Sequence, residues 1–551
     1  MIKSQLQQRL DHCFHQGVEQ GFWSDAAAGR YTLEVPKREG QGDYSTNMAM
    51  VVAGMEKRNP REVAGELVGL LAADGELLDR VEIAGPGFVN FFLNTAVWST
   101  VLPVIFEKGS DFGRAYFGSG KKVLVEFVSA NPTGPLSVGH GRNAILGDSI
   151  ARLLSAVGYD VVREYYFNDA GRQMRVLGAS TKARYLELLG LDSDFPEDGY
   201  QGDYISDIAR KLIEEHGESL KVQDVSFFKQ VAQEAIFADI DTTLKRIGIT
   251  FDSYFNEHTL YEKGLIEDVV GELKSKKLVY EKDGATWFKT TEFGQEKDRV
   301  IIKKTGEPTY RLPDIAYHRE KFKRGFDWMI DIFGADHIAT VPDVMSGIRA
   351  LGYDDSRVTV ILHQFVTLMR GGKQVKMSTR KATFVTVDEL VEEVGVDALR
   401  FYFLLRKPDS QLEFDLDLAT SQSQENPVYY VQYAHARLCS IARQAKEQQV
   451  SVGSLEDTDL LLLREEEEIG LLKAMDDYPA MVAGAAGDLA PHRVIFFLMD
   501  LAGRFHRYYN KHKVLGDDPG LTTARLQLCR AVMIVLRNGL HLAGMTAPEK
   551  M

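Results

Sequence analysis

The sequence predicts an α/β protein in three parts, with a parallel, doubly wound sheet at its centre. Three observations support this prediction. A small α+β region fills residues 1–110, a strand–helix–strand unit begins at residue 122, and helical periodicity dominates from about residue 410. The chain has 551 residues, 44% hydrophobic and 26% charged, which is the composition of a soluble globular protein with several domains.

The first part alternates between helical and strand periodicity. Residues 61–71 repeat their apolar side chains with the spacing of a helix. Residues 81–83 and 88–92 have the character of two strands, and the Gly-Pro-Gly sequence at 85–87 predicts a turn between them. A glycine-rich stretch, residues 108–120, is typical of a linker and leads out of this domain.

The second part, residues 111–410, contains the clearest pattern. Lys122–Val128 is an apolar run typical of a buried strand, Gly139–Ala156 has a helical period, and Asp160–Phe167 is a second strand. Together they form a βαβ unit, the opening of a parallel sheet. We expect an inserted segment within this domain at around residues 175–300.

The third part, residues 411–551, is predicted to be an all-α domain because helical patterning continues through almost all of it. The glutamate run Glu465–Glu468 is interpreted as the solvated face of one of its helices.

Composition also excludes several classes of protein. No apolar run approaches the length of a membrane span, and the start of the chain lacks the apolar core of a secretory signal. Three scattered cysteines are too few for a disulfide framework, so we expect a reducing cytoplasm. His12–His15 could be imagined as a metal site, but a helix surface is the simpler interpretation, and we expect no permanently bound metal.

The net charge of −14 argues against a nonspecific nucleic-acid coat, although local basic sites stay possible. One such site is the segment Arg504–Lys513, which carries four full positive charges, three aromatic side chains and no acid. Basic residues interleaved with aromatic residues suit RNA loops, in which unstacked bases lie on aromatic faces. A packed helix with a solvated basic edge is the alternative.

The turn between the first strand and helix of the βαβ unit is the first candidate ligand site. In open α/β sheets, ligands bind at the carboxyl ends of strands and against helix N-termini. Gly139 and Gly141 would let the backbone approach a nucleotide, and His140 could donate to a phosphate or ribose oxygen. Taken alone, the motif is better explained as an ordinary glycine-rich turn.

The second candidate is the loop that runs from Gly371 to Lys381. It places four cations within nine residues and opens on two glycines, which suits a mobile clamp on a polyphosphate. On composition alone, an ordinary solvated basic loop is an equally good interpretation.

Together and in this order, the two loops resemble the HIGH and KMSKS signatures of class I aminoacyl-tRNA synthetases. Further segments are similar to arginyl-tRNA synthetases in particular, and these are Glu126–Pro135, Tyr166–Gly171, Asp397–Arg400, Glu425–Arg437 and the final Met551. The resemblance covers essentially the whole chain. It implies a Rossmann-like catalytic domain, an N-terminal domain that contacts tRNA and an anticodon-binding helical bundle.

The resemblance also implies the reaction. ATP, as its Mg²⁺ complex, and L-arginine would form arginyl-adenylate and pyrophosphate, and the 3′-terminal ribose of tRNA(Arg) would then accept the arginyl group. Positioning and charge stabilisation would carry the catalysis, without a side-chain nucleophile. We expect a cytoplasmic monomer with no membrane association.

By this resemblance the arginine pocket is lined by Glu126, Asn131, Tyr310, Asp314 and His337. A guanidinium has five donors and no acceptor, so its pocket requires carboxylates and carbonyls in fixed positions. Asp314 would pair with the guanidinium, while Glu126 and Asn131 would hold the α-amino and carboxylate end. Tyr310 and Asp314 share a face if their segment is helical.

The remaining implied site residues bind ATP or tRNA. The ATP-binding residues would be Ser137, Gly139, His140, Gly141, Lys376 and Met377, and the catalytic residues His140, Lys376, Ser378 and Arg380. The tRNA-binding residues would be Tyr429, Gln432, Arg437, Arg507 and Lys511.

Two positions depart from the family signatures. Ser137 stands where HIGH has its first histidine, and Thr379 stands where KMSKS has its second lysine. Arg380, Lys381 or Lys373 would have to supply the missing cation. These departures keep two alternatives open: a tRNA-binding protein that has lost adenylation, and a class I synthetase of another specificity. The carboxylates of the arginine pocket argue against both.

Overall fold

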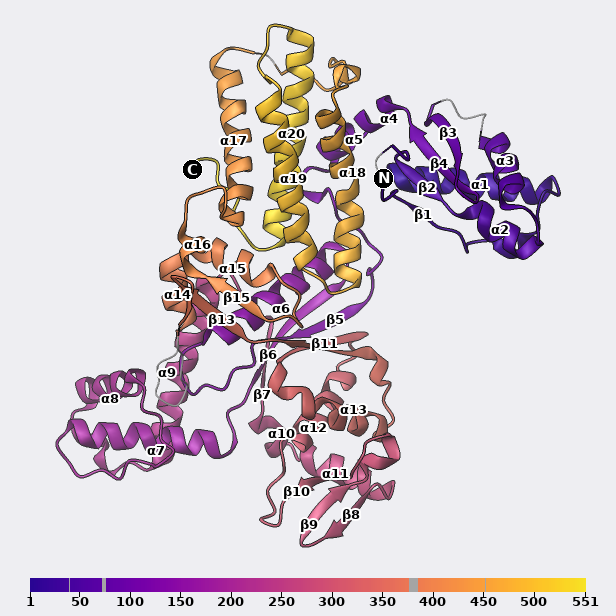
Figure 1. Ribbon diagram of the computed structural model, residues 1–551. Helices are drawn as coiled ribbons and strands as arrows, with labels where there is room; N and C mark the ends of the chain where they lie inside the picture. Colours follow the sequence, from indigo (N-terminus) through magenta and orange to yellow (C-terminus); the bar gives the residue numbers. More distant parts are fainter. Residues whose placement is uncertain (39, 72–75, 376–384, 451) are drawn as a thin grey trace.

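The computed structural model describes residues 1–551 except 39, 72–75, 376–384 and 451. At its centre is a five-stranded sheet in the order β12-β11-β5-β6-β7, in which all neighbouring strands are parallel (Figure 1). Its strands are β5 (Lys122–Glu126), β6 (Asp160–Phe167), β7 (Ser253–Asn256), β11 (Trp328–Gly334) and β12 (Val358–His363). The predicted parallel sheet is confirmed.

Helix α6 (Val138–Ala156) connects β5 to β6 and is buried along most of its length. The predicted βαβ unit is therefore present, but its first strand ends at Glu126, two residues earlier than expected. The strand stops because Val128 and Ser129 have positive φ angles of 65° and 40°, which a strand cannot contain.

Two segments are inserted between the strands, and most of their elements extend away from the sheet (Figure 1). Between β6 and β7 lie α7 (Gly171–Leu188), α8 (Asp203–His216) and α9 (Val225–Arg246). Between β7 and β11 lie α10 (His258–Glu262), α11 (Leu265–Ser275), the antiparallel strands β8 (Val279–Lys282), β9 (Ala285–Phe288) and β10 (Arg299–Ile302), and α12 (Arg311–Lys323). Helix α13 (Val341–Ala350) then connects β11 to β12.

The N-terminal part is an α+β domain, as predicted. Its four-stranded antiparallel sheet has the order β1-β2-β4-β3. Its elements are α1 (Ile2–Glu19), β1 (Leu33–Glu34), β2 (Tyr44–Thr46), α2 (Met48–Glu56), α3 (Pro60–Leu71), β3 (Leu78–Ala84) and β4 (Phe88–Leu93). Helices α4 (Thr95–Ser99) and α5 (Val101–Lys108) connect it to the rest of the molecule.

The glycine-rich stretch after α5 is held in place and is not a free linker. The side chain of Asn538 donates to the carbonyl oxygens of Gly109, at 2.8 Å, and Phe112, at 3.3 Å. Phe112 is itself buried and stacks on Tyr478 with ring centres 5.9 Å apart. The predicted linker is therefore packed against the C-terminal helices.

The C-terminal part is helical apart from a short strand near its start. A small sheet in the order β14-β13-β15 precedes it, formed by β13 (Val366–Arg370), β14 (Lys373–Gln374) and β15 (Leu412–Asp415). Helices α14 (Val387–Val394), α15 (Val396–Leu404) and α16 (Leu416–Thr420) pack beside it, and the bundle comprises α17 (Pro427–Glu447), α18 (Glu466–Gly487), α19 (His492–Lys511) and α20 (Pro519–Leu542).

One side chain of the glutamate run is not solvated. Glu468 is fully buried, and it accepts a hydrogen bond from the guanidinium of Arg525 at 2.8 Å. Its other oxygen accepts the backbone N–H of Glu465, which caps α18. The interpretation of this run as a solvated face is wrong for Glu468, because α18 turns that position toward α20.

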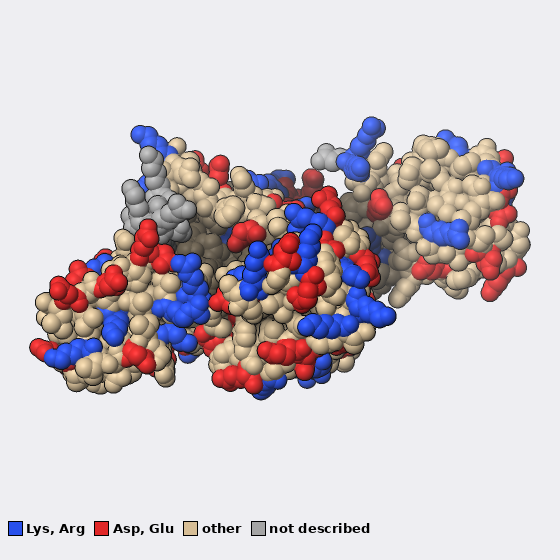
Figure 2. All heavy atoms as spheres, turned by 90° about the horizontal axis from the view of Figure 1, so that it is seen from below, with Lys and Arg blue, Asp and Glu red and all other residues tan. Residues whose placement is uncertain are grey.

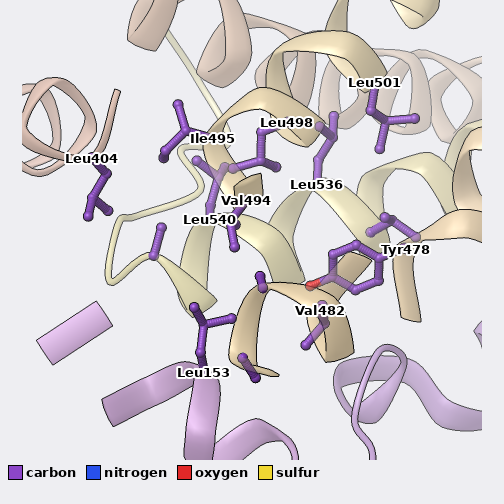
Figure 3. Close-up of a cluster of buried hydrophobic side chains, with 14 of the residues drawn as sticks. Leu153, Leu404, Tyr478, Val482, Val494, Ile495, Leu498, Leu501, Leu536 and Leu540 are labelled. Carbon is purple, nitrogen blue, oxygen red and sulfur yellow. The ribbon is translucent and has the colours of Figure 1, made fainter. Parts of the chain in front are cut away.

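The bundle shares its hydrophobic core with the parallel sheet domain. Leu153 of α6 and Leu404 of α15 lie beside side chains of α18, α19 and α20 in one buried cluster (Figure 3). This continuity fixes the bundle to the helix that starts at the carboxyl edge of the sheet. None of the described helices has both the length and the apolar character needed to cross a lipid bilayer.

A buried arginine adds a polar connection at the same junction. Arg400 of α15 is fully buried, and its guanidinium pairs with Asp148 of α6. It also donates to the carbonyl oxygens of Ile247, at 2.9 Å, and Ala543, at 3.0 Å. One side chain thus connects the parallel sheet domain, the end of an insertion and the end of the bundle.

We expect Arg400→Met to lower the free energy of unfolding by about 3–5 kcal/mol, because it leaves the buried Asp148 without its main partner. Arg152→Met is the matched control: Arg152 contacts the same carboxylate at 2.7 Å but is one-third exposed, so its loss should cost about 1 kcal/mol or less. Urea unfolding of both variants checks this. Equal losses would contradict the role assigned to Arg400.

Candidate active site

A cavity of about 790 Å³ opens at the carboxyl ends of the parallel strands, where open α/β sheets bind their ligands. Every strand of the sheet contributes to its wall, either from its last residues or from the residue that follows it. Eight of the predicted site residues line this cavity: Glu126, Asn131, Ser137, Gly139, His140, Tyr310, Asp314 and His337.

The turn after β5 forms one wall and is strained. Val128 is β-branched, and the left-handed conformation it adopts is costly for such a residue. The backbone N–H of Val128 donates to the Asn143 side chain at 2.6 Å, and the Ser129 hydroxyl donates to Glu126 at 3.0 Å. These bonds hold the strained turn and aim it into the cavity, since both of its residues line it.

Helix α6 presents its N-terminus to the cavity. Ser137 caps the helix, and its hydroxyl lies 3.1 Å from Nδ1 of His140 in a capping box. Burial lowers the pKa of His140, which favours the neutral ring that can donate one hydrogen bond. The helix terminus and this ring together suit an anionic ligand such as a phosphate.

The two glycines of this turn differ in their surroundings. A Cβ atom on Gly139 would contact only Ser137, so the backbone there is open to the cavity. A Cβ atom on Gly141 would lie 2.9 Å from Val387 and 3.2 Å from Phe403. Gly141 does not line the cavity, and close packing of α6 against α14 and α15 explains its lack of a side chain.

Helix α12 forms the opposite wall. Its N-cap residue is Tyr310, so Tyr310 and Asp314 do share a face, and both line the cavity. Tyr310 is 75% exposed at the mouth of the cavity. His337, also at the mouth, stacks on Phe333 with ring centres 5.0 Å apart, and Asn131 donates to Gln173 at 2.8 Å.

Asp314 lies deeper in the cavity and is the most informative residue of the site. Its carboxylate has no hydrogen-bond or ion-pair partner among the residues that the structure describes. Burial raises the pKa of Asp314 to about 7, and the negative charges of Glu126 and Glu257 act in the same direction although His318 opposes them. A carboxylate of this kind is complemented by a cationic ligand that can also donate hydrogen bonds.

Sequence reasoning missed Glu257, a further buried carboxylate in the cavity wall besides Glu126 and Asp314. Burial raises the pKa of Glu257 as well. It directly follows β7, and a polar residue at the end of a strand is the signal that could have identified it, but the short edge strand was not predicted. Lys321 was also missed, although it continues the periodicity of Tyr310 and Asp314 along α12.

The predicted residues of the basic loop lie outside the described residues. Lys376, Met377, Ser378 and Arg380 all fall within 376–384. The described part of this loop, β14 and the preceding turn, is next to β13, whose first residue Val366 lines the cavity.

The predicted tRNA-binding residues lie on the helical bundle, away from the cavity. The guanidinium of Arg437 lies between two aromatic rings, 4.7 Å from the centre of Tyr433 and 4.6 Å from that of Tyr509. Tyr429 stacks on Tyr433 with the rings 9° from parallel. These side chains form a half-buried surface of stacked planar groups on α17 and α19.

The other three predicted tRNA-binding residues have different surroundings. Gln432 is buried, and its amide donates to Asp397 and to the carbonyl oxygen of Thr546. Lys511 pairs with Glu467 at 2.6 Å. Arg507 is exposed, and within the described part of the chain no acid pairs with it.

Comparison with known families divides the chain into three matching parts. Residues 1–93 match the arginyl tRNA synthetase N-terminal domain, residues 103–402 match the catalytic domain of class I (R) tRNA synthetases, and residues 431–551 match the DALR anticodon binding domain.

Individual relatives cover the whole chain. It is 65% identical to the arginine–tRNA ligase of Desulfotalea psychrophila and 49% identical to that of Syntrophotalea carbinolica, with 100% of each chain covered. A solved structure of a putative arginyl-tRNA synthetase from Campylobacter jejuni is 32% identical over 83% of this chain and 100% of its own, with a TM-score of 0.77. The Thermus thermophilus arginyl-tRNA synthetase, 24% identical with both chains fully covered, shares the fold with a TM-score of 0.76.

These matches agree with a cavity at the carboxyl edge of a parallel sheet, an unpaired carboxylate within it and a separate helical bundle. The class I fold, the ATP-dependent chemistry and the ligation of arginine to tRNA all follow from them. The chain belongs to the arginyl-tRNA synthetase family.

Proposed function

We propose that the cavity binds L-arginine with its guanidinium between Asp314 and Glu257 and its α-amino and carboxylate end at Glu126 and Asn131. Tyr310 and His337 then lie at the entrance. The observation that carries this assignment is the unpaired, desolvated carboxylate of Asp314, which a guanidinium complements in both charge and hydrogen bonding.

ATP, as its Mg²⁺ complex, is proposed to bind at the N-terminus of α6. Ser137, Gly139 and His140 would contact it there, and Lys376, Met377, Ser378 and Arg380 would approach from the basic loop. These groups would orient the arginine carboxylate toward the α-phosphate. They would also stabilise the charge that develops on the phosphates.

tRNA(Arg) is proposed to bind the bundle through Tyr429, Arg437 and Arg507, with Gln432 and Lys511 nearby. The surface of Tyr433, Arg437 and Tyr509 supports base stacking, because a guanidinium between aromatic rings and a half-buried aromatic face are groups on which an unstacked base can lie. Figure 2 shows that the acidic and basic side chains of the described residues are interspersed on the face opposite the bundle, and these residues form no uniformly basic patch there.

Four further assignments belong to the same proposal. Residues 1–110 would form the tRNA-contacting domain, 111–410 the catalytic domain with its insertions, and 411–551 the anticodon-binding domain. The enzyme would act as a cytoplasmic monomer.

Asp314→Asn should lower kcat/KM for arginine by about 10²-fold, because the guanidinium loses its charged partner, while KM for ATP stays the same. In the unchanged enzyme, protonation of Asp314 below about pH 7 should raise KM for arginine about tenfold between pH 8 and pH 6, and the variant should lose this dependence. Aminoacylation kinetics at several pH values check both. The matched control is Glu320→Gln on the same helix, whose side chain pairs with Lys323. An unchanged KM for arginine in Asp314→Asn would refute the assignment.

Arg380→Ala should slow adenylate formation by about 10²-fold if Arg380 supplies the cation that Thr379 cannot. Lys373→Ala and Lys381→Ala, the two other candidates, should then have smaller effects, and none of the three should weaken tRNA binding. Single-turnover formation of the adenylate with tRNA present distinguishes them. Normal rates in Arg380→Ala would assign the role to another cation.

Arg507→Ala should weaken tRNA binding and lower the slope of log K against log salt by about one, the value for one lost phosphate contact. Lys511→Ala should change the slope less, because Glu467 already neutralises that ammonium. Titration of tRNA at several salt concentrations measures both slopes. Equal slopes in Arg507→Ala and the unchanged enzyme would place the RNA contact elsewhere.

A further inference from the structure

Lys321 of α12 is fully buried behind the wall of the cavity, which it does not line. Its ammonium donates to Glu126 at 2.5 Å and to Asp331 at 2.6 Å. A lysine is almost never buried to this extent unless it is paired. Its position therefore depends on these two carboxylates, of which only Glu126 faces the cavity.

The sheet itself creates the need for this cation. Asp331 of β11 and Glu126 of β5 are register partners on adjacent parallel strands, so their side chains lie next to each other on one face. Burial raises the pKa of Glu126, and the charge of Asp331 adds to this, while Lys321 opposes both. Lys321 is the charged donor that favours an ionised Glu126.

The remaining oxygens of the two carboxylates are also held. The Ser129 hydroxyl donates to the other oxygen of Glu126 at 3.0 Å, and His318 contacts the other oxygen of Asp331 at 2.8 Å. The second ring nitrogen of His318 donates to the carbonyl oxygen of Asp314 at 2.8 Å. Glu126 is thus fixed from behind by a network that reaches the backbone of Asp314.

We propose that Lys321 is a positioning residue for the amino acid substrate: it holds Glu126 directed into the cavity, where Glu126 accepts hydrogen bonds from the α-ammonium group. This rests on the proposed role of Glu126. Lys321 acts only through Glu126 and touches no part of the substrate, so its effect is confined to ligands that carry the α-amino group.

A purely structural role of Lys321 predicts a different effect of its removal on ligand binding. If Lys321 served only to fill and neutralise the core, its removal would loosen the cavity as a whole. All ligands of the cavity would then bind more weakly, whether or not they carry an α-amino group.

The test compares two ligands in Lys321→Met. Arginine carries the α-amino group, and 5-guanidinopentanoate is the same molecule without it. We expect KM for arginine to rise by about tenfold or more, whereas the inhibition constant of 5-guanidinopentanoate and KM for ATP stay within about twofold. The matched control, Lys323→Met, removes an exposed lysine that pairs with Glu320 on the same helix and should change none of the three.

Glu126→Gln tests the role of Glu126 separately from the role of Lys321. If Glu126→Gln weakens the binding of arginine but not of 5-guanidinopentanoate, and Lys321→Met shows no such selectivity, the role of Glu126 holds and that of Lys321 is refuted. If neither variant discriminates, the assignment of Glu126 itself fails. In the double variant, Lys321→Met should add no further loss for arginine to that of Glu126→Gln.

Equal weakening of both ligands by Lys321→Met would overturn the proposal, as would an unchanged KM for arginine. Thermal unfolding establishes that each variant is folded. If Lys321→Met is not, the ligand pair is measured in Lys321→Met/Asp331→Asn, compared with Asp331→Asn alone. This background removes the neighbouring negative charge, and the same selective loss for arginine is expected.

Discussion

The active site depends on one constraint, the burial of three acidic side chains side by side on one face of the central sheet. Glu126 of β5 is the register partner of both Asp331 on β11 and Glu164 on β6. Three neighbouring carboxylates beneath a helix are tolerable only if that helix brings cations and donors. Helix α12 brings Lys321 to the first two and Arg324 to Glu164, at 2.5 and 2.8 Å, with the Tyr317 hydroxyl also donating to Glu164.

This arrangement fixes both the rotation and the height of α12 on the sheet. The ion pairs near its C-terminal end determine which face points down, and the same face carries Tyr310 and Asp314 at its N-terminal end. The unpaired carboxylate of Asp314 is therefore placed over the cavity by pairs that lie elsewhere on the helix. The buried carboxylates of Glu126, Asp331 and Glu164 are paired with cations, whereas Asp314 has no charged partner among the described residues and can accept a ligand.

Much of the fold and of the candidate site could be predicted from the sequence, because short-range patterns of residues determine these parts. The apolar run before Glu126 and the helical period after Ser137 predicted the βαβ unit, and the i, i+4 spacing of Tyr310 and Asp314 predicted a shared face if their segment is helical. The end of β5 at Glu126 could not be predicted, because the left-handed turn at Val128 and Ser129 is held by residues distant in the sequence: Asn143 accepts from the N–H of Val128, and the N–H of Tyr166 donates to the Ser129 hydroxyl. The burial of Glu468 and Glu257 could not be predicted for a similar reason. From the sequence alone, a single charged side chain is expected to be solvated until the helix or strand that packs against it is known. The catalytic roles in the basic loop stay predictions.

The raised pKa of Asp314 has a consequence for the energetics of ligand binding in the cavity. Near neutral pH this carboxylate is protonated in a substantial fraction of the molecules. With the proposed binding mode, an arriving guanidinium would displace that proton, so binding would exchange one cation for another instead of simply adding one. The heat of arginine binding measured near neutrality would accordingly contain the ionisation heat of whichever buffer takes up the released proton.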